Sequence, residues 1–317
     1  MYKEKKICVV VPAYNEEKLI AKTVNTIPDF VDYILVVDDG SKDKTSEIVK
    51  SLIKSDKRIL LKKHERNSGV GAALSTGYIW SRDNDIDITV VMNGDNQMDP
   101  GDLTNLIDPI ADDTADYAKG NRLVTGEAWD IIPHIRYLGN SVLTFLTKIA
   151  SGYWHVTDSQ SGYTAINKKA LHLLPLENIY PKYGAPNDIL VRLNIYHMRV
   201  TDVPIRPVYE VGEKSDMKIH GVVWTISLLI IRSFFRRMVQ KYIIRDFHPL
   251  IFFYMAGFLM ILVDIPLIVR LIIRWLNFDK IPPINALAIL FCTFVGIQFF
   301  LFAMLFDMEA NKELKGK

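Results

Sequence analysis

The sequence predicts an α/β fold with a parallel sheet, followed by an amphipathic helix and two membrane-spanning helices. Short apolar runs alternate with helix-like stretches in the first half of the chain, and polar clusters close three of those runs. Two long, almost uncharged segments stand near the carboxyl end. Strands that alternate with helices indicate βαβ units and a parallel sheet. Apolar segments of about twenty residues are long enough to cross a membrane.

Five stretches are predicted as strands because they are short, apolar and rich in β-branched residues. They are Lys6–Pro12, Tyr33–Ser41, Arg58–His64, Ile88–Asp95 and Asp116–Arg122. Helical spacing follows the first two, in NEEKLIAKTVNTI and KTSEIVKSLI, and GVGAALSTGYIW is predicted as a helix between the third and fourth. From about Pro133 the pattern becomes mixed, which is typical of an α+β extension.

Composition sets broad limits. The chain has 317 residues, enough for one or two domains, and a net charge of +2 gives no reason to expect a nucleic-acid partner. Cys8 and Cys292 lie in apolar runs and show neither metal-ligand spacing nor a disulfide framework. Because Met1 to Lys6 leads straight into a strand-like run, no signal peptide is expected.

The stretch WTISLLIIRSFFRRMVQKYIIRD predicts an amphipathic helix. Its apolar residues recur at spacings of three and four, which places them on one face of a helix. Its basic residues are assigned to the other side of that helix. The apolar set is Trp224, Leu228, Ile231, Phe235, Met238 and Tyr242, and the basic set is Arg232, Arg236, Arg237 and Lys241. A basic amphipathic helix is typical of an anionic membrane surface, and a core or oligomer helix is the alternative.

Two segments, Pro249–Ile273 and Ile284–Phe306, are predicted to span the membrane. Asp264 interrupts the first span, and because an isolated charge there is costly, we expect it to face the other helix or a membrane edge. Lys and Arg are more frequent before the first span and after the second than in the connecting loop. This excess predicts that both ends of the chain, and the catalytic domain, lie in the cytoplasm.

Polar clusters follow three of the predicted strands. The first contains Pro12, Tyr14 and Glu16, the second Asp38 and Asp39, and the third Asn93, Gly94, Asp95 and Gln97. Each alone is also explained as a helix cap or a turn. Because the carboxyl ends of parallel strands meet in one crevice, all three together predict a ligand site. Carboxylate and amide oxygens suit Mg²⁺ or Mn²⁺.

These motifs resemble a known family. VPAYNEE, VVDDGSKDKT, ERNSGVGAALSTGY, MNGDNQMDP and KGNR are similar to the GT-A domain of family 2 inverting glycosyltransferases. With two spans behind it, the chain resembles the polyprenyl-phosphate glycosyltransferases, of the dolichyl-phosphate mannose synthase type. The resemblance covers roughly Lys6–Ser215.

The resemblance implies a nucleotide-sugar donor and a divalent metal. Pro12, Tyr14 and Glu16 match one nucleotide-contacting loop, and Val37, Asp38 and Asp39 match the loop that holds base and ribose. Asn93, Gly94, Asp95 and Gln97 match the metal motif, usually Asp-x-Asp-x-Gln, with Asn93 in place of its first Asp. Asp95 and Gln97 are therefore the expected ligands of Mg²⁺ or Mn²⁺. Arg122 takes the place of an arginine that contacts the donor phosphates.

The resemblance also implies an acceptor site for a lipid phosphate. Arg136 and Asn140, four residues apart on one helix face, match residues that contact the acceptor phosphate. Asp158 and Asp188 lie in stretches where the family orients the acceptor or holds a base, and each is also explained as a cap or turn. We favour Asp158 for organising the site and keep Asp188 as its rival. Lys214 matches a donor-phosphate loop whose usual arginine is absent here, with Tyr209 or Arg206 as substitutes.

Taken together, the sequence predicts a GT-A catalytic domain over residues 1–218, an amphipathic region over 219–247, and two spans with a tail over 248–317. The expected reaction is inverting transfer of one sugar, from GDP-mannose, UDP-glucose or a UDP-N-acetylhexosamine, to dolichyl or undecaprenyl phosphate. Two alternatives stay open: a polysaccharide-type membrane transferase, and a membrane-anchored nucleotide-binding protein with degenerate catalysis. The sugar, the lipid and the oligomeric state are left open.

Overall fold

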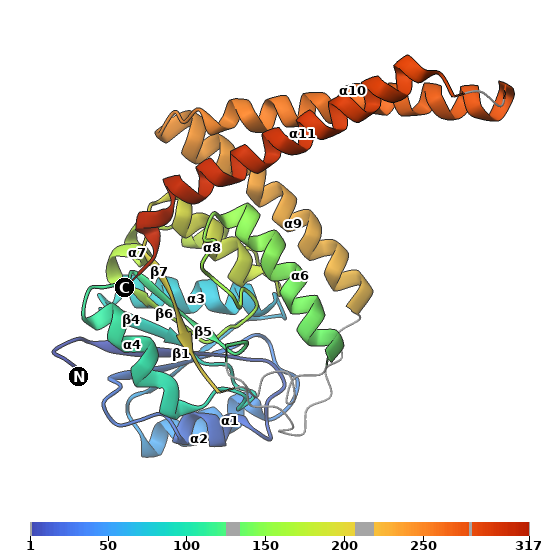
Figure 1. The fold of residues 1–317 in the computed structure, drawn as a ribbon. Helices are drawn as coiled ribbons and strands as arrows, with labels where there is room; N and C mark the ends of the chain where they lie inside the picture. The colour runs from blue at the N-terminus through green and yellow to red at the C-terminus, as the bar shows by residue number, and fades with distance from the viewer. Residues whose placement is uncertain (1, 125–133, 207–218, 279–280, 317) are drawn as a thin grey trace. The chain divides into compact units, whose positions relative to one another are not determined.

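The computed structural model describes residues 2–124, 134–206, 219–278 and 281–316, and their side chains except at positions 135, 136 and 219–223. The chain forms two compact units (Figure 1). The first comprises Met1–Arg237 with Glu313–Lys317, and the second comprises Met238–Lys312.

A seven-stranded sheet forms the centre of the first unit. Its strands, in the order β3-β2-β1-β4-β6-β5-β7, are β3 (Ile59–Lys63), β2 (Tyr33–Asp38), β1 (Ile7–Ala13), β4 (Ile88–Val91), β6 (Thr164–Asn167), β5 (Tyr117–Asn121) and β7 (Val200–Pro204). The pairs β1–β2, β1–β4 and β2–β3 are parallel, as the alternating pattern predicts. β5 is also parallel to β7, a strand that the pattern does not predict. β6 is antiparallel to both β4 and β5, so the sheet is mixed. At four residues, β6 is too short to show a period of its own.

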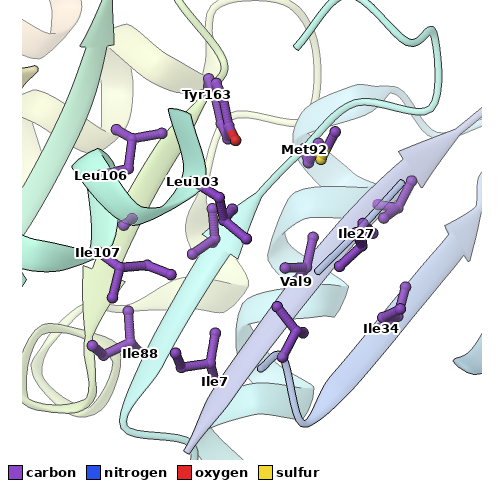
Figure 2. Close-up of a cluster of buried hydrophobic side chains, with 14 of the residues drawn as sticks. Ile7, Val9, Ile27, Ile34, Ile88, Met92, Leu103, Leu106, Ile107 and Tyr163 are labelled. Atoms are coloured by element: carbon purple, nitrogen blue, oxygen red, sulfur yellow. The ribbon is translucent and has the colours of Figure 1, made fainter. Parts of the chain in front are cut away.

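Helices cover both faces of this sheet, which buries every residue of β1. One face packs against α1 (Ile20–Asn25), α2 (Thr45–Ser55) and α4 (Leu103–Ala111). Figure 2 shows that core, where Val9 and Ile88 of the sheet lie near Leu103 and Ile107 of α4. The other face packs against α3 (Val70–Asp83), α7 (Lys168–Leu173) and α8 (Ala185–Ile195). Three-layer packing of this kind is the α/β architecture that the sequence predicts.

Two further helices of the first unit share one apolar cluster with α8. α6 (His134–Ser151) contributes Ala150 and α9 (Ile219–Val239) contributes Ile226 and Ile230. Ribbons of α6 and α9 run beside one another (Figure 1). Helix α9 therefore lies on the catalytic unit through its inner face.

The predicted apolar face of α9 is correct in its first part and wrong in its second. Trp224, Leu228, Ile231 and Phe235 point outward, with exposed fractions of 77, 42, 54 and 49%. Met238 and Tyr242 are buried instead, together with Arg237 and Lys241 from the predicted basic side. Arg237 is buried because it donates to the carbonyl oxygens of Ile149 and Ala150. After Val239 the helix continues as a π-helix over Gln240–Arg245, whose wider turn changes which residues share a face from Lys241 onward.

The second unit is dominated by two long helices, α10 (Leu250–Phe278) and α11 (Pro283–Ala310), which contain the two predicted spans. Both are long and apolar enough to cross a membrane, and only 11% of the most apolar stretch of each is buried. They are therefore unlike the core helices of a soluble protein. Asp264 is 6% exposed and accepts a hydrogen bond from Thr293 Oγ1 of α11 at 2.7 Å, so it faces the other helix, as expected.

Candidate active site

Three loops at the carboxyl edge of the sheet enclose a cavity of about 610 Å³. The loop after β1 supplies Pro12, Tyr14 and Glu16, and Asp39 follows β2. The loop after β4 supplies Asn93, Gly94 and Asp95, and the start of α3 adds Asn67, Ser68 and Gly69. The structure thus brings residues of all three predicted clusters to one cavity. Of the predicted donor residues, Val37, Asp38, Gln97 and Arg122 are not among the described residues that line it.

The first two loops are tied to one another by backbone hydrogen bonds. Asn15, in the left-handed region at φ 57°, donates its backbone N–H to Ser41 Oγ at 2.9 Å. Its side-chain Oδ1 accepts from the backbone N–H of Lys42, also at 2.9 Å. The backbone N–H of Glu16 donates to Thr45 Oγ1 at 2.8 Å. Asparagine tolerates this backbone conformation better than most residues, so the strained turn that presents Tyr14 and Glu16 is held from both sides.

Asp38 and Asp39 do different work although they are adjacent. Asp38 is fully buried and accepts from the backbone N–H of Ser41 at 2.8 Å. Burial alone would raise the pKa of Asp38, but hydrogen bonds from Ser41 and Ser46 lower it. Its carboxylate therefore shapes the turn. Val37 is likewise a core residue, packed with Ala73 of α3.

Asp39 faces the cavity and holds the opposite wall. Its carboxylate accepts from the backbone N–H groups of Ser68, at 3.0 Å, and Gly69, at 2.7 Å. His64 Nδ1 lies 2.7 Å from Asp39 Oδ1, and His64 Nε2 lies 2.9 Å from Thr76 Oγ1 of α3. Asp39 thus fixes the entry into α3, which places Asn67, Ser68 and Gly69 on the cavity.

The loop after β4 carries the expected metal ligands. Gly94 fits between the ends of β1 and α1, because an added Cβ would lie 3.2 Å from Ala13 Cβ and 3.3 Å from Ile20 Cδ1. Asn96 adopts a left-handed φ of 56°, and the backbone N–H of Gln97 donates to Asp95 Oδ1 at 3.1 Å. Asn93 and Asp95 line the cavity, whereas Gln97 is not among its lining residues. Within the described part of the chain, no three His, Cys, Asp or Glu residues gather as a complete metal site.

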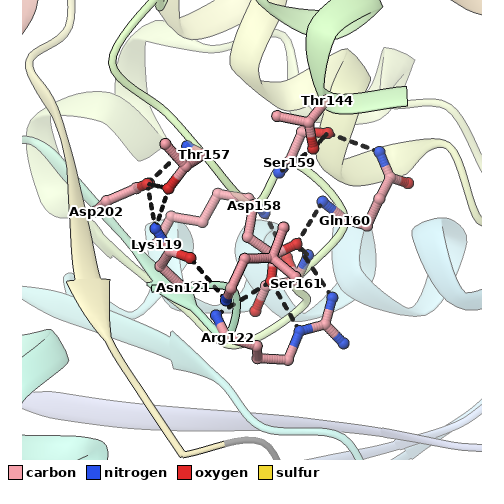
Figure 3. Close-up of polar contacts among 11 residues, drawn as sticks. Lys119, Asn121, Arg122, Thr144, Thr157, Asp158, Ser159, Gln160, Ser161 and Asp202 are labelled. Carbon is pink, nitrogen blue, oxygen red and sulfur yellow. Dashed lines mark hydrogen bonds and ion pairs between the residues drawn. The ribbon is translucent and has the colours of Figure 1, made fainter. Parts of the chain in front are cut away.

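Arg122, which is partly exposed, forms an ion pair with Asp158 (Figure 3). Asp158 is fully buried, and it also accepts from the backbone N–H groups of Gln160, at 3.2 Å, and Ser161, at 3.1 Å. Burial favours the neutral acid, but the charge of Arg122 and its hydrogen bonds hold the pKa of Asp158 below its usual range. The carboxylate therefore stays ionised and fixes both the arginine and the loop at Ser161.

A buried lysine lies next to that pair. Lys119 of β5 is fully buried and donates from Nζ to the carbonyl oxygen of Ser161 (Figure 3). Burial lowers the pKa of Lys119 to about 8, although the carboxylates of Asp158 and Asp202 oppose that shift. Asp202 accepts from Asn121 Nδ2 and from the backbone N–H of Thr157, both at 2.7 Å. These contacts brace β5 and β7 beneath Arg122.

Asp188 lies in the first turn of α8 and is also buried. Its Oδ2 accepts from Arg192 Nε at 2.7 Å and from the backbone N–H of Tyr180 at 3.0 Å. Its Oδ1 accepts from Arg236 Nη2 of α9. Asp188 does not line either of the cavities described here, whereas its neighbours Ala185 and Pro186 line the smaller one.

The predicted acceptor residues lie on α6, as the four-residue spacing requires. Asn140 is half-buried on that helix, and the side chain of Arg136 lies outside the described part of the structure. Lys214 and Tyr209 also lie outside the described residues. Arg206 is described, and its backbone N–H donates to Asp102 Oδ2 at 3.1 Å.

The sequence reasoning missed one wall of the site. Lys182 and Tyr183, in the segment before α8, line the large cavity opposite the strand ends. A second cavity of about 140 Å³ adjoins it and shares Pro12, Val70, Asn93 and Tyr183. It is lined further by Leu74, Val91, Tyr117, Gln160, Gly162, Thr164, Ala185, Pro186 and Ile189, among others. No local motif marks Tyr183, because only the packing of its segment against α3 brings it to the site.

Comparison with known proteins agrees with this geometry. The model of the family described as glycosyl transferase family 2 matches residues 8–174. A UDP-N-acetylglucosamine–dolichyl-phosphate N-acetylglucosaminyltransferase of Methanococcus voltae is 35% identical over 219 residues, which cover 65% of this chain and 87% of that protein. An undecaprenyl-phosphate mannosyltransferase of Micrococcus luteus is 28% identical, over 66% of this chain and 87% of its own length.

Among solved structures, the glucosyl-3-phosphoglycerate synthase of Mycobacterium tuberculosis has a similar fold. Its complex with Mn²⁺, uridine diphosphate and glucosyl-3-phosphoglycerate aligns with a TM-score of 0.54 and 21% identity. The alignment covers 74% of this chain and 80% of that one. At this identity the likeness supports the GT-A fold of the catalytic unit.

Proposed function

Because the chain belongs to glycosyl transferase family 2, we propose that it transfers one sugar from a nucleotide-sugar to a polyprenyl phosphate at a membrane. One observation carries the proposal: the loops after β1, β2 and β4 converge on a single cavity in a chain that continues into two membrane-length helices. Relatives named for transfer to dolichyl and undecaprenyl phosphate support the lipid acceptor. GDP-mannose, UDP-glucose and a UDP-N-acetylhexosamine remain the candidate donors.

The two adjoining cavities suit the two halves of such a donor. We place the nucleoside diphosphate in the larger cavity, between Asp39 and Asp95, where backbone turns and polar side chains line the wall. The sugar takes the smaller cavity, which adjoins the first at Asn93 and has polar groups on Gln160 and Thr164. Its volume is about 140 Å³, the scale of one sugar ring.

A divalent ion fits the loop after β4. Asp95 supplies one carboxylate at the cavity, and Asn93 and Gln97 supply neutral oxygens nearby. A single carboxylate is enough for Mg²⁺ or Mn²⁺ when substrate phosphates provide the remaining ligands. When bound, the ion would supply positive charge to the diphosphate leaving group as a Lewis acid. The complex of the similar synthase with Mn²⁺ and uridine diphosphate supports this assignment for the fold.

The reaction needs little help from a protein base. In the proposed step, an oxygen of the lipid phosphate forms a bond to the anomeric carbon while the bond from that carbon to the nucleoside diphosphate breaks, with inversion. A phosphate monoester is mostly dianionic at pH 7, because its second pKa is near 6. Asp158 is held by Arg122, and Asp188 by Arg192 and Arg236, so both carboxylates are engaged elsewhere. We therefore assign Asp158 to organising the site.

Cations are needed instead, because an anionic acceptor must approach an anionic donor. Arg122 is anchored by Asp158, and we propose that it steadies the charge on the leaving diphosphate. We assign the acceptor phosphate to Arg136 and Asn140 on α6 and a donor phosphate contact to Lys214. The Arg122 assignment is supported by its place at the end of β5, beside the loop that carries Ser161 and Gly162.

The catalytic unit is proposed to lie on the cytoplasmic surface of the membrane. Trp224, Leu228, Ile231 and Phe235 form an exposed apolar stripe on α9, and Leu138, Val142 and Phe145 are exposed on α6. Contiguous exposed apolar surface of this kind marks an interaction with lipid or protein. The proposed regions remain a catalytic domain over 1–218, the amphipathic region 219–247, and the spans with their tail over 248–317.

Incubation of the purified protein with radiolabelled nucleotide sugars, polyprenyl phosphate and Mn²⁺ tests the function. We expect label in a lipid fraction that depends on the lipid acceptor and on one nucleotide sugar. Labelled polymer would instead indicate a polysaccharide-type transferase, and nucleotide binding without any labelled product would indicate a degenerate enzyme. The anomeric configuration of the product, read by NMR, tests inversion.

A further inference from the structure

The segment from Tyr180 to Pro186 forms the outer wall of both cavities. Lys182 and Tyr183 line the larger one, and Tyr183 and Pro186 line the smaller one. The segment is pressed against α3, where an added Cβ on Gly71 would lie 2.1 Å from Tyr180 O. The backbone N–H of Ala72 donates to Pro181 O at 3.1 Å. Any shift of this segment therefore changes the space offered to the donor.

Helix α9 rests on this segment at Gly184, the residue before α8. An added Cβ on Gly184 would come within 2.3 Å of Leu229 Cδ2 and 3.2 Å of Tyr180 Cδ1. A larger residue here would force the Leu229 side chain to move, so glycine suits the close approach of α9. This contact is apolar and sets the distance between α9 and the cavity wall.

A second contact, at Asp188, is ionic. The carboxylate joins Arg236 of α9 to the backbone N–H of Tyr180, where the wall segment begins. Arg192, one turn further along α8, completes its hydrogen bonds. Asp188 is only 1% exposed, so its bonds are screened little by solvent. Because Arg192 stays beside Asp188, loss of Arg236 alone does not leave the carboxylate without a counter-charge.

The opposite side of α9 carries the exposed apolar stripe of Trp224, Leu228, Ile231 and Phe235. Phe235 and Arg236 are adjacent, so the outward stripe and the inward ion pair belong to the same turn of helix. One face of α9 is thus available to a lipid surface, and another contacts the segment Tyr180–Pro186 that lines the cavities. A change in the position of α9 on the lipid would therefore be transmitted to the donor cavity.

We propose that Arg236 is a positioning residue for the donor cavity. It acts through Asp188, so that donor binding depends on the position of α9 against the segment Tyr180–Pro186. The inference rests on the proposed function for the identity of the ligand. It predicts that Arg236 governs affinity for the nucleotide rather than the chemical step.

The test measures dissociation constants of UDP and GDP, with Mn²⁺ present, for the full chain in detergent micelles. We expect Arg236→Ala to weaken binding of the preferred nucleotide about tenfold, roughly the effect of one lost buried contact. Arg236→Lys should recover most of that loss, because it restores a positive charge beside Asp188. Arg232→Ala is the matched control, since Arg232 is an exposed arginine one turn earlier on α9.

A double variant tests the route. If Arg236 acts through Asp188, Asp188→Asn combined with Arg236→Ala should bind nucleotide no more weakly than the worse single variant. Additive losses would overturn the proposed route, and so would unchanged binding by Arg236→Ala. Steady-state kinetics should show a raised KM for the donor with kcat within about threefold of wild type.

The dependence of nucleotide binding on the contact between α9 and lipid is tested with Ile231→Glu, which alters only the exposed apolar stripe. In lipid nanodiscs we expect this change to weaken nucleotide binding when Arg236 is present and to have no further effect beside Arg236→Ala. An equal effect in both backgrounds would overturn the coupling. If the wild type binds nucleotide but labels no lipid, the proposed function fails while these binding results still decide the inference. If the wild type binds neither nucleotide, both fail.

Discussion

Arg122 holds Asp158 with two nitrogens, Nε at 2.8 Å from Oδ2 and Nη2 at 3.1 Å from Oδ1. This bidentate geometry suits a guanidinium and not an ammonium. The pair joins the end of β5 to the loop that carries Ser161 and Gly162. The carboxylate therefore fixes the orientation of the arginine, and neither residue is among those that line the two cavities.

Replacing Asp158 with Asn should lower kcat by about a hundredfold, the scale of losing one oriented electrostatic group. Arg122→Lys should fall in the same range because lysine cannot bridge both oxygens. Transfer of labelled sugar to polyprenyl phosphate measures kcat, and the thermal unfolding midpoint checks that each variant is folded. A wild-type rate in Asp158→Asn would remove Asp158 from the site.

The acid limb of the pH profile should belong to the lipid phosphate. The lowered pKa of Asp158 means that this carboxylate is charged throughout the range from pH 5 to 9. The acceptor phosphate titrates near pH 6, and kcat/KM should fall below that value as the dianion is lost. In Asp158→Asn and Asp188→Asn, the maximal kcat/KM should be lowered or unchanged. The pH at which kcat/KM falls to half of that maximum should not move. Disappearance of the limb in either variant would identify a general base.

Metal dependence should respond to Asn93. Chelation should abolish transfer, and added Mn²⁺ or Mg²⁺ should restore it. Asn93→Asp adds a second carboxylate at the cavity and should lower the metal concentration for half-maximal rate, whereas Asp95→Ala should raise it tenfold or more, about the scale of lost ligand support. Electron paramagnetic resonance of Mn²⁺ with bound UDP or GDP measures the metal affinity apart from turnover. Equal affinities in the two variants would place the metal elsewhere.

Lys119 should make stability depend on alkaline pH. Its folded pKa of about 8 lies below the ordinary value, so the folded state releases its proton before the unfolded state does. Between pH 8 and about 10.4 the unfolded state binds more protons, and stability rises with pH by on the order of 2 kcal/mol from this group. Lys119→Met removes that rise.

The thermal midpoint of Lys119→Met minus that of wild type should therefore be more positive at pH 7 than at pH 10. Comparing the two proteins cancels the titration of every other group. Lys62→Met is the matched control, because Lys62 is an exposed lysine of β3 in the same sheet. A constant difference across this range would mean that Lys119 titrates normally.

Local patterns predicted the parallel half of the sheet and the polar loops at its edge. The strands β1 to β4 and Asn93 to Gln97 could be found because strand period and end-of-strand chemistry are local properties. The antiparallel β6 and the wall residues Lys182 and Tyr183 could not, since only tertiary packing brings them to the site.

The burial of charged side chains was the feature that the sequence predicted least well. Arg237 and Lys241 read as the solvent face of a helix, yet both are buried. Arg237 donates to the carbonyl oxygens of Ile149 and Ala150 at the end of α6, and Lys241 donates to Asn311 Oδ1. A sequence pattern shows that a residue is basic, but it does not show whether a carbonyl or amide oxygen distant in sequence will accept its hydrogen bonds in a buried site.

Asp264 should stabilise the pairing of α10 and α11 through Thr293. In an apolar surrounding, an interhelical hydrogen bond contributes about 0.6 kcal/mol on average and up to about 1.7. Thr293→Val should lower the free energy of unfolding by that amount when Asp264 is present. In the Asp264→Leu background it should have almost no effect, because leucine has no acceptor for the hydroxyl. Thr293→Ser keeps the hydroxyl and should resemble wild type. Detergent-titration unfolding of the four proteins measures the coupling. Equal costs of Thr293→Val in both backgrounds would mean that the bond at 2.7 Å does not contribute to stability, and that Asp264 is retained for another reason.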